Sequence, residues 1–486
     1  MTLSELDIRP ADGELDPKDW DEFTQAVNRV LDGAIAKFQA ASSGRVWTPT
    51  PDTLKADLQT ALPSAPTDLA ALTDQILALM PYGVGNTHPR FFGWVHGSGA
   101  PGNLLAEIAA SALNANCGGR DHVGIYVERQ VVDWCKTLFS FPAEASGLLV
   151  SGTSMATIIA AKTARDEALA FASRQNGVQG AKLVGYTSEQ AHTCLARAFD
   201  MIGLGTDALR KITCNAEGQM DPNALRQAIA ADRANGAHPF FLAGTAGTVN
   251  TGAIDDLTAL ADVAEEHALW FHVDGAFGAC AMISSEIAPR LSGIDQADSL
   301  AFDFHKWMHV NYDAGCVLIR DGDAHRKAFA SRPDYLAADG TALAGGEPWP
   351  VDFGPELSRG FRALKVWAHL KEHGTEKIGR SISRNCAQAA RLGQLVEAHH
   401  FFELLAPVSL NICCFRYTAP GLSEHELEAL NAQLIEQIQL SGIAAPSSTR
   451  IHGRFAIRVN ITNHRTQFED VEILLNALER IAGEVA

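Results

Sequence analysis

The spacing of apolar residues separates an N-terminal region from the rest of the chain. From Trp20 to Ala40 the apolar residues recur at the three- and four-residue intervals of an amphipathic helix. A second such stretch runs to Met80, after a Pro-, Thr- and Ser-rich crossing from Val46 to Pro66. Residues 1–80 are therefore predicted to form a helical N-terminal segment.

Between residues 81 and 365, short apolar runs alternate with helical patterns. This alternation is typical of a mostly parallel sheet that helices cover on both faces. The predicted strands of this seven-stranded sheet are Leu148–Val150, Lys182–Tyr186, Arg210–Thr213, Phe240–Ala243, Leu269–Val273, Leu300–Phe302 and Cys316–Ile319. Ligands of such sheets bind beyond the carboxyl ends of the strands, so chemistry is expected just after these runs.

The remaining pattern predicts a smaller α+β domain over residues 366–486. A long helical pattern begins near Phe361, strand-like runs cover Ser409–Tyr417 and Arg454–Ile461, and an amphipathic helix spans Val471–Ile481. The Gly- and Ala-rich stretch Ala330–Pro350 is predicted to be a mobile loop of the large domain. The predicted fold is thus an α/β protein with a helical N-terminal segment and a small C-terminal domain.

Composition narrows the class of protein. The chain has 486 residues, a net charge of −18, 47% hydrophobic and 20% charged residues, which is ordinary for a globular protein with a sizeable core. The acidic balance argues against a nucleic-acid partner, and no uncharged stretch has the pattern of a membrane span. The nine cysteines form no CxxC pair, and the acidic N-terminus lacks the pattern of a secretory signal. A cytoplasmic enzyme of small-molecule metabolism is expected.

A candidate anion site follows the first predicted strand. Ser151, Gly152, Thr153 and Ser154 stand between Leu148–Val150 and a helical pattern. Hydroxyl and free backbone N–H groups at a helix N-terminus can hold a phosphate. The same residue types also serve as ordinary helix caps, so both interpretations are open at this point.

Two further strand ends carry an acid and an amine. Asp274 ends the run Leu269–Val273, where a buried carboxylate needs a metal ion, an arginine or a protonated ring nitrogen as its partner. Lys306 follows the next run, roughly 30 residues further along, which is enough for one helical crossover. An amine at this edge is readily desolvated and can attack a carbonyl group.

Together these three features match the requirements of pyridoxal 5'-phosphate (PLP). The lysine would bind the aldehyde, and the aspartate would keep the ring nitrogen protonated so that the ring accepts electrons. His192, after the run Lys182–Tyr186, would supply a flat group to cover the ring.

Several segments resemble the group II PLP-dependent amino-acid decarboxylases, the family of the aromatic-L-amino-acid, histidine and glutamate decarboxylases. They occur in the family's order over roughly residues 80 to 370. The matching segments are Thr87–Trp94 (THPRFFGW), Gly152–Thr157 (GTSMAT), Ser188–His192 (SEQAH), His272–Ala276 (HVDGA), Phe304–Trp307 (FHKW), Val310–Asp313 (VNYD) and Arg359–Trp367 (RGFRALKVW).

This resemblance implies a role for each matching residue. Lys306 would be the Schiff-base lysine, Asp274 the partner of the ring nitrogen and His192 the residue stacked on the ring. The remaining cofactor contacts that it implies are Thr153, Ser154, His305 and Thr248. It also implies the fold-type-I architecture of PLP-dependent transferases and a homodimer, with the N-terminal segment packed across the partner.

The resemblance also bears on the reaction. In the family's decarboxylases a tyrosine at the position of Tyr335 donates a proton to Cα after carbon dioxide leaves, whereas members that form aldehydes tend to carry phenylalanine. Tyr335 therefore favours decarboxylation of an L-amino acid to its amine.

The expected substrate pocket departs from that of the aromatic enzymes. The residues that we expect to contact the substrate are Trp94, His96 and Asn116, with Asn114, Arg120 and His122 also available. Because this set is more polar than in the aromatic enzymes, the hypothesis is a polar or acidic amino acid, although Trp94 leaves room for an aromatic ring. Asp303 stands where the aromatic enzymes often have Asn, and Val249 where many relatives have a second Thr.

Three other functions remain as alternatives. A metallohydrolase could use His272, Asp274, His305 and His309 as ligands, but this would leave Lys306 without a role. A PLP enzyme could act instead as an aldehyde synthase, an aminotransferase-like enzyme or a carbon–carbon lyase. A catalytically silent scaffold of the same fold is the third.

Overall fold

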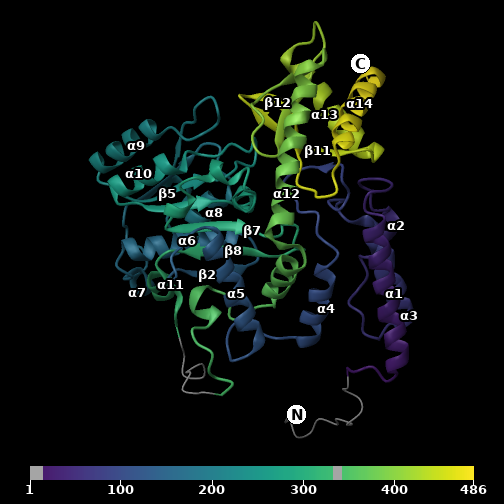
Figure 1. The fold of residues 1–486 in the computed structure, drawn as a ribbon, viewed down its shortest axis with the longest axis horizontal. Helices are drawn as coiled ribbons and strands as arrows, with labels where there is room; N and C mark the ends of the chain where they lie inside the picture. The colour runs from purple at the N-terminus through teal and green to yellow at the C-terminus, as the bar shows by residue number, and fades with distance from the viewer. Residues whose placement is uncertain (1–14, 332–341, 486) are drawn as a thin grey trace.

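Two β-sheets organise the protein, for which a computed structural model describes residues 15–331 and 342–485 (Figure 1). The larger sheet has seven strands, and each corresponds to one of the predicted runs. Across the sheet they are β2 (Ser146–Val150), β8 (Gly315–Ile319), β7 (Ser299–Asp303), β6 (Trp270–Asp274), β5 (His238–Thr245), β3 (Leu183–Ser188) and β4 (Leu209–Ile212).

The sheet is mostly parallel, as predicted. Strands β4, β3, β5, β6 and β7 pair in parallel, and β8 pairs antiparallel with both β7 and β2. Since β8 alone is reversed among these strands, β2 points the same way as the other five. Their carboxyl ends therefore share one edge of the sheet.

Helices cover both faces of this sheet. One face carries α6 (Thr153–Ala168), α8 (Cys194–Met201) and α11 (Gly322–Phe329), and the other carries α5 (Val123–Leu138), α9 (Pro222–Ala234) and α10 (Leu257–His267). The strands are apolar without interruption because both faces are buried. Thus Leu148 packs with the α6 core, while its neighbour Leu149 packs with the α5 core.

The C-terminal part forms the smaller α+β layer around a five-stranded sheet. Its order is β1 (Phe91–Phe92), β11 (Ala445–Ile451), β12 (Arg454–Asn460), β10 (Ile412–Tyr417) and β9 (Phe402–Leu404). Helices α13 (Glu424–Ser441) and α14 (Phe468–Val485) pack on this sheet. Strand β1 pairs in parallel with β11. A segment that precedes the large sheet in the sequence thus forms one edge of the smaller sheet.

A single long helix connects the two parts. Helix α12 (Arg362–Ala398) starts beside β2 and ends against β9, with a kink at Gly374, whose φ of 67° lies in the left-handed region. The short helix α7 (Ser173–Asn176) follows α6.

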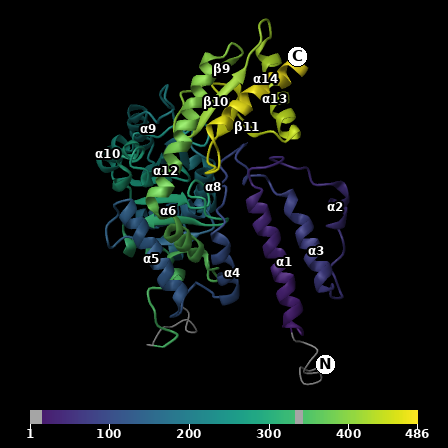
Figure 2. The same cartoon turned by 45° about the vertical axis from the view of Figure 1, so that its right-hand side comes forward.

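The N-terminal helices α1 (Trp20–Gln39), α2 (Asp52–Asp57) and α3 (Leu69–Leu79) lie together at one side of the molecule (Figure 2). Helix α4 (Asn103–Leu113) follows them in the sequence, before the first strand of the large sheet. Helix α1 packs beside α3, yet none of its residues is buried. No helix in the described part of the chain is long and apolar enough to cross a membrane.

Two details differ from the sequence predictions. The strand expected from Ser409 begins at Ile412, because Ser409 and Ile412 form an isolated bridge that turns the chain. Within the predicted loop Ala330–Pro350, residues 332–341 lie outside the described part, and Trp349 is fully buried rather than part of an open loop.

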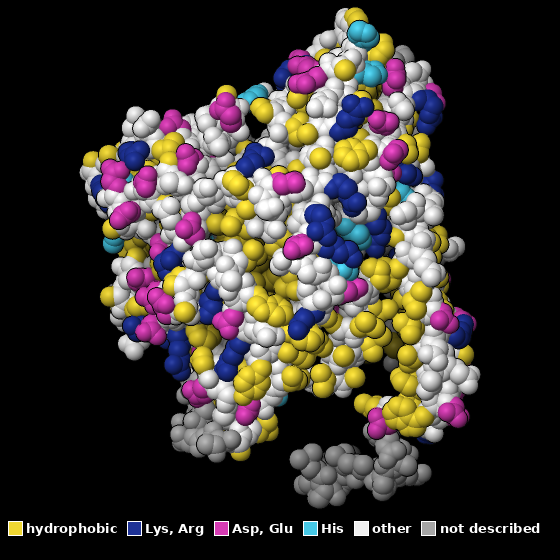
Figure 3. All heavy atoms as spheres, viewed as in Figure 1, with side chains coloured by type: hydrophobic (Ala, Val, Ile, Leu, Met, Phe, Trp, Pro, Cys, Tyr) yellow, Lys and Arg dark blue, Asp and Glu magenta, His cyan; other side chains and the backbone are white. Residues whose placement is uncertain are grey.

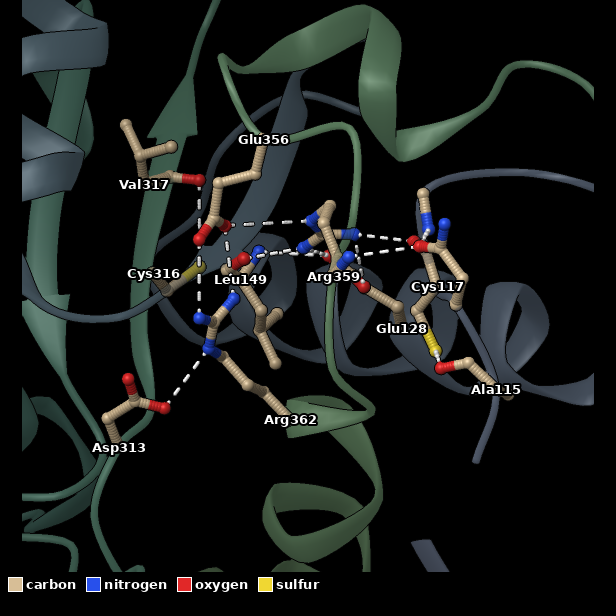
Figure 4. A network of polar contacts seen from close by, with 12 residues as sticks. Ala115, Cys117, Glu128, Leu149, Asp313, Cys316, Val317, Glu356, Arg359 and Arg362 are labelled. Carbon is tan, nitrogen blue, oxygen red and sulfur yellow. Dashed lines mark hydrogen bonds and ion pairs between the residues drawn. The ribbon is translucent and has the colours of Figure 1, made fainter. Parts of the chain in front are cut away.

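A buried ion pair fastens the start of α12 to the first strand of the large sheet (Figure 4). The Arg359 guanidinium donates to both carboxylate oxygens of Glu128, at 2.6 and 2.9 Å, and to the carbonyl oxygens of Cys117 and Leu149. Glu128 also accepts the backbone N–H of Leu149 at 3.0 Å. This network fixes β2 two residues before Ser151, the start of the candidate anion site.

Replacing Arg359 should destabilise the fold strongly. Arg359→Leu would leave the Glu128 carboxylate buried and unpaired, which costs about 3–5 kcal/mol. The control Arg391→Leu breaks the exposed pair with Glu472 and should cost at most about 1 kcal/mol. Urea unfolding followed by tryptophan fluorescence measures both free energies, and equal losses would contradict this account.

Candidate functional site

The carboxyl ends of β2, β5, β6 and β7 enclose a cavity of about 550 Å³. Most of the predicted site residues line it, although they come from segments far apart in sequence. These residues are Trp94, His96, Thr153, Ser154, His192, Asp274, His305 and Lys306.

One end of the cavity is the N-terminus of α6. No side chain of the Ser151–Ser154 segment caps this helix, so the ordinary capping interpretation does not account for these hydroxyl groups. The Thr153 hydroxyl is buried and finds no partner in the part of the chain that the structure describes, and the Thr153 backbone N–H donates to the Asp303 carboxylate at 2.7 Å. The segment therefore offers hydrogen-bond donors to an anion.

The Asp303 carboxylate balances the charge of Lys306. Its second oxygen lies 2.8 Å from the Lys306 ammonium nitrogen, and Asp303 is almost completely buried. Burial alone would lower the pKa of Lys306, but the carboxylates of Asp303 and Asp274 outweigh it and raise that pKa. Strand β8 passes close to this pair, and it can do so because residue 315 is glycine. A Cβ at that position would lie 2.6 Å from the Asp303 carboxylate.

Asp274 lies at the buried end of the cavity. Burial raises the pKa of its carboxyl group, whereas the nearby charges of Lys306 and His192 act in the opposite direction. One carboxylate oxygen accepts the Ala276 backbone N–H at 3.1 Å, and the other lies 3.7 Å from the Cys194 sulfur. A cationic ring nitrogen at this end would restore the charge balance.

Two histidines from different loops complete this part of the site. The exposed His192 accepts the Cys194 backbone N–H through Nδ1 at 3.2 Å, which orients its ring. His305 accepts the Ala314 backbone N–H through Nδ1 at 3.0 Å, and burial lowers the pKa of its imidazole. Its ring lies 4.4 Å from that of Tyr312.

The outer wall of the cavity is rich in aromatic rings. His96 lies between Trp94 and Tyr312, with ring centroids 5.9 and 6.1 Å away. Burial, followed by the charge of Lys306, lowers the pKa of His96, so this ring is neutral near pH 7. Trp94 has a φ of 50°, a strained value for a bulky residue, and such strain is frequent at functional sites.

Three predicted residues are not among those that the structure places around the cavity. The Thr248 hydroxyl bonds Thr251 at 3.0 Å, and the neighbouring Val249 faces the cavity instead. Asn116 accepts the backbone N–H groups of Gly118 and Arg359 and so holds its own loop. Tyr335 lies outside the described residues.

The other polar candidates for the pocket are used elsewhere in the chain. Arg120 lies over the ring of Trp349, and His122 accepts the Gly124 N–H. Asn114 ends α4 in a left-handed conformation. In a single chain, His96 is therefore the one residue of the expected polar set that lines this cavity, among the residues that the structure describes.

Sequence reasoning missed three residues of this region. Tyr312 and Thr245 line the cavity, and the Thr245 hydroxyl is buried with no partner among the residues described. Arg458, from β12, is buried and bonds only carbonyl and hydroxyl oxygens, including that of Trp94 at 2.9 Å. The position of Thr245 at the end of a predicted strand was a usable signal, whereas nothing in the sequence links Arg458 to residues more than 300 positions away.

The metal alternative finds no support in the geometry. No group of three or more His, Cys, Asp or Glu residues in the described ranges is placed to hold a metal ion. The His272 ring instead bonds the Ser299 hydroxyl at 2.9 Å and stacks on Phe241. Its burial lowers the pKa to about 3, as expected of a neutral core histidine.

The cavity fits PLP by the chemistry of its donors. Two buried hydroxyl groups, on Thr153 and Thr245, have no partner among the described residues. A helix N-terminus for a phosphate, an amine for an aldehyde and a buried carboxylate for a ring nitrogen surround the same space.

Removing the Asp303 charge should change the titration of Lys306. Asp303→Asn is expected to lower the pKa of the Lys306 amine, so that PLP becomes covalently attached at lower pH. The yield of borohydride-trapped cofactor as a function of pH measures this shift. Asp313→Asn is a matched control, since that carboxylate pairs with Arg362, and identical pH profiles for the two variants would contradict the role of Asp303.

Comparisons with known proteins agree with this geometry. The family model described as "Pyridoxal-dependent decarboxylase conserved domain" matches residues 51–418. The aromatic-L-amino-acid decarboxylase of Bacillus atrophaeus is 32% identical over 410 residues, which is 82% of each chain.

Two solved structures share the fold. The structure of Oryza sativa TDC with PLP and tryptamine has a TM-score of 0.89 at 24% identity and covers 97% of this chain and 100% of that one. The 4-hydroxyphenylacetaldehyde synthase of Rhodiola rosea has a TM-score of 0.85 at 27% identity, covering 97% and 100%. The fold-type-I architecture is thereby confirmed. The chain belongs to the pyridoxal-dependent decarboxylase family, and it is a PLP-dependent enzyme of the carboxy-lyase class.

Proposed function

We propose that this enzyme decarboxylates an L-amino acid to the corresponding amine and carbon dioxide. The observation that carries the proposal is the convergence of Lys306, Asp274 and the α6 N-terminus on one cavity. When bound there, PLP supplies an electron sink for the pair of electrons left at Cα.

Each residue of the chain has a distinct part in this proposal. Lys306 is the covalent anchor of the cofactor, and Thr153 and Ser154 hold its phosphate together with His305. Asp274 keeps a proton on the ring nitrogen, and the buried position of its carboxyl group makes this pairing strong. The exposed ring of His192, which Cys194 orients, covers the cofactor face.

The pocket favours a flat substrate side chain. Trp94, His96 and Tyr312 present rings to the cavity, and the pKa of His96 is lowered, so this wall carries no permanent cation for an acidic side chain. The buried Arg458 does not line the cavity, because its guanidinium donates to the Trp94 carbonyl oxygen and to other backbone and hydroxyl oxygens behind this wall. We therefore prefer an aromatic L-amino acid over the polar one that the sequence suggested.

Aldehyde formation is the second candidate, because it shares every cofactor contact. One similar protein is named a 4-hydroxyphenylacetaldehyde synthase, and another an aromatic-L-amino-acid decarboxylase. The presence of tyrosine at position 335 favours amine formation, since a phenolic hydroxyl can deliver a proton to Cα.

A homodimer is part of the same proposal. Helices α1, α3 and α4 expose large apolar side chains that a soluble monomer would keep from water. These residues are Trp20, Val27, Ile35, Leu72, Ile76, Leu79, Leu105, Ile108 and Leu113. A second copy of the chain is the occupant that covers such a surface through the N-terminal helices.

Product analysis tests the reaction and its substrate class together. Tyrosine, tryptophan, glutamate and aspartate are supplied separately, and carbon dioxide, amine, aldehyde and ammonia are measured. We expect equal amounts of amine and carbon dioxide. The kcat/KM for tyrosine and tryptophan should be at least about tenfold higher than for glutamate and aspartate, which is the change expected from the loss of one favourable contact. A preference for the acidic pair would contradict the aromatic pocket, and ammonia with aldehyde would contradict simple decarboxylation.

Tyr335→Phe is expected to redirect the product. Without the phenolic proton donor, amine formation should fall by about 100-fold, the usual contribution of one general acid. If dioxygen intercepts the unprotonated carbon, aldehyde, ammonia and peroxide rise instead. Tyr312→Phe is the control, because it removes a hydroxyl from the cavity wall. An unchanged rate of amine formation in Tyr335→Phe would remove this residue from the reaction.

A further inference from the structure

A group of cations lies outside the cavity, on the surface beside α12. Figure 3 shows Lys and Arg side chains gathered around histidines on this face. The group consists of Lys377 and Arg384 of α12 and Arg465 of the loop after β12, together with the imidazoles of His373 and His464; the charged side chains lie close enough to lower the pKa of His464 or of the adjacent His369. Positions 377 and 384 are seven residues apart in the part of α12 that follows the kink at Gly374, so they share one face of the helix, whereas His373 directly precedes the kink.

These cations have no carboxylate partner. Within the residues that the structure describes, no carboxylate oxygen lies within 4.0 Å of the charged nitrogens of Lys377, Arg384 or Arg465. Arg384 donates to the His464 carbonyl oxygen, and Arg465 reaches two carbonyl oxygens only at 3.4 Å. Such bonds leave the charges uncompensated, in a chain whose net charge is −18.

Neighbouring cations of the same helix differ in this respect. Arg380 pairs with Glu376 at 3.6 Å, and Arg391 pairs with Glu472 at 3.4 Å. The one acidic contact of the group is Glu372, which lies 3.6 Å from Nε2 of His373. Of the other cations of α12, Lys371 alone lacks a carboxylate partner among the described residues, and it lies over the ring of Trp367.

Part of this group is also desolvated. Nε of Arg384 and Nδ1 of His373 are buried from water and have no hydrogen-bond partner within residues 15–331 and 342–485. A buried donor without a partner costs free energy, and a charged one costs more. These side chains thus retain donors and positive charge that no group in the described part of the chain satisfies.

The electrostatic surroundings agree with this geometry. Burial, followed by the charges of Arg465, His369, Arg384 and His373, lowers the pKa of His464 to about 3, and all of these effects act in one direction. An anion bound beside His464 would raise the pKa of this imidazole and so act against each of these effects.

We propose that Lys377, Arg384 and Arg465, with His373 and His464, form a binding site for a small anion that carries phosphate or carboxylate groups. Guanidinium groups bind the oxygens of such anions in pairs, and a lysine adds a mobile point charge. The site is separate from the cofactor cavity, and none of its five residues lines that cavity.

The site is nevertheless connected to the loop that follows Lys306. The Ser98 hydroxyl bonds Nδ1 of His464 at 2.9 Å and Nδ1 of His309 at 3.1 Å. His309 stands three residues after Lys306 and has a φ of 60°. An anion held by His464 and its neighbours would therefore contact the small domain and, through Ser98, the lysine loop.

Isothermal titration calorimetry tests the proposal on the full-length enzyme with its cofactor fixed by borohydride, so that the phosphate cup of the cavity is filled. Inorganic phosphate, pyrophosphate and succinate are titrated separately at constant ionic strength, which separates a phosphate ligand from a carboxylate one. We expect saturable binding of at least one of these anions, with one anion per chain.

The variants Arg384→Gln and Lys377→Gln should each weaken this binding by about tenfold or more, the equivalent of one charge-assisted contact. Lys377 is exposed, so its replacement keeps the test valid if Arg384→Gln fails to fold. Arg391→Gln is the matched control on the same helix and should bind as the parent does. The absence of saturable binding for all three anions, or equal affinity in all variants, would overturn the proposal.

Discussion

The common direction of strands β2, β5, β6 and β7 is the constraint on which the site depends. Because their carboxyl ends share one edge, the segments that follow these strands, from Ser151 to Lys306, line a single cavity. The buried Arg359–Glu128 pair fixes β2 in that arrangement, and glycine at position 315 lets β8 pass close to Asp303. The direction of the strands therefore determines where the reactive side chains meet.

Charge balance inside this cavity gives the residues their different roles. Lys306 is held between two carboxylates, and its contact with Asp303 explains why an acid can stand beside a phosphate site: the carboxylate faces the amine and a helix N–H. Asp274 is as buried as Asp303 but has no cationic side chain in hydrogen-bonding contact among the described residues. A protonated ring nitrogen is the partner that this carboxylate lacks.

The sequence predicted the strands of the large sheet and most of the residues that line the cavity, and the reason differs from one group of residues to the next. Continuous apolar runs located all seven strands of the large sheet, and residues directly after them, such as Asp274 and Lys306, were placed correctly in one cavity. The sequence could not predict in which direction a side chain points. Thr248 was expected to contact the cofactor, but its hydroxyl bonds that of Thr251. Contacts between distant segments, such as Arg458 with Trp94, left no local pattern to read.

The most direct test of this account is to locate the covalent anchor of the cofactor. The protein is loaded with PLP, reduced with borohydride, digested and mapped by mass spectrometry, in parallel with Lys306→Arg and Asp274→Asn. We predict the label on Lys306 alone, its loss in Lys306→Arg, and weaker retention of the cofactor in Asp274→Asn. Recovery of the label on another lysine of the parent protein would contradict the central claim.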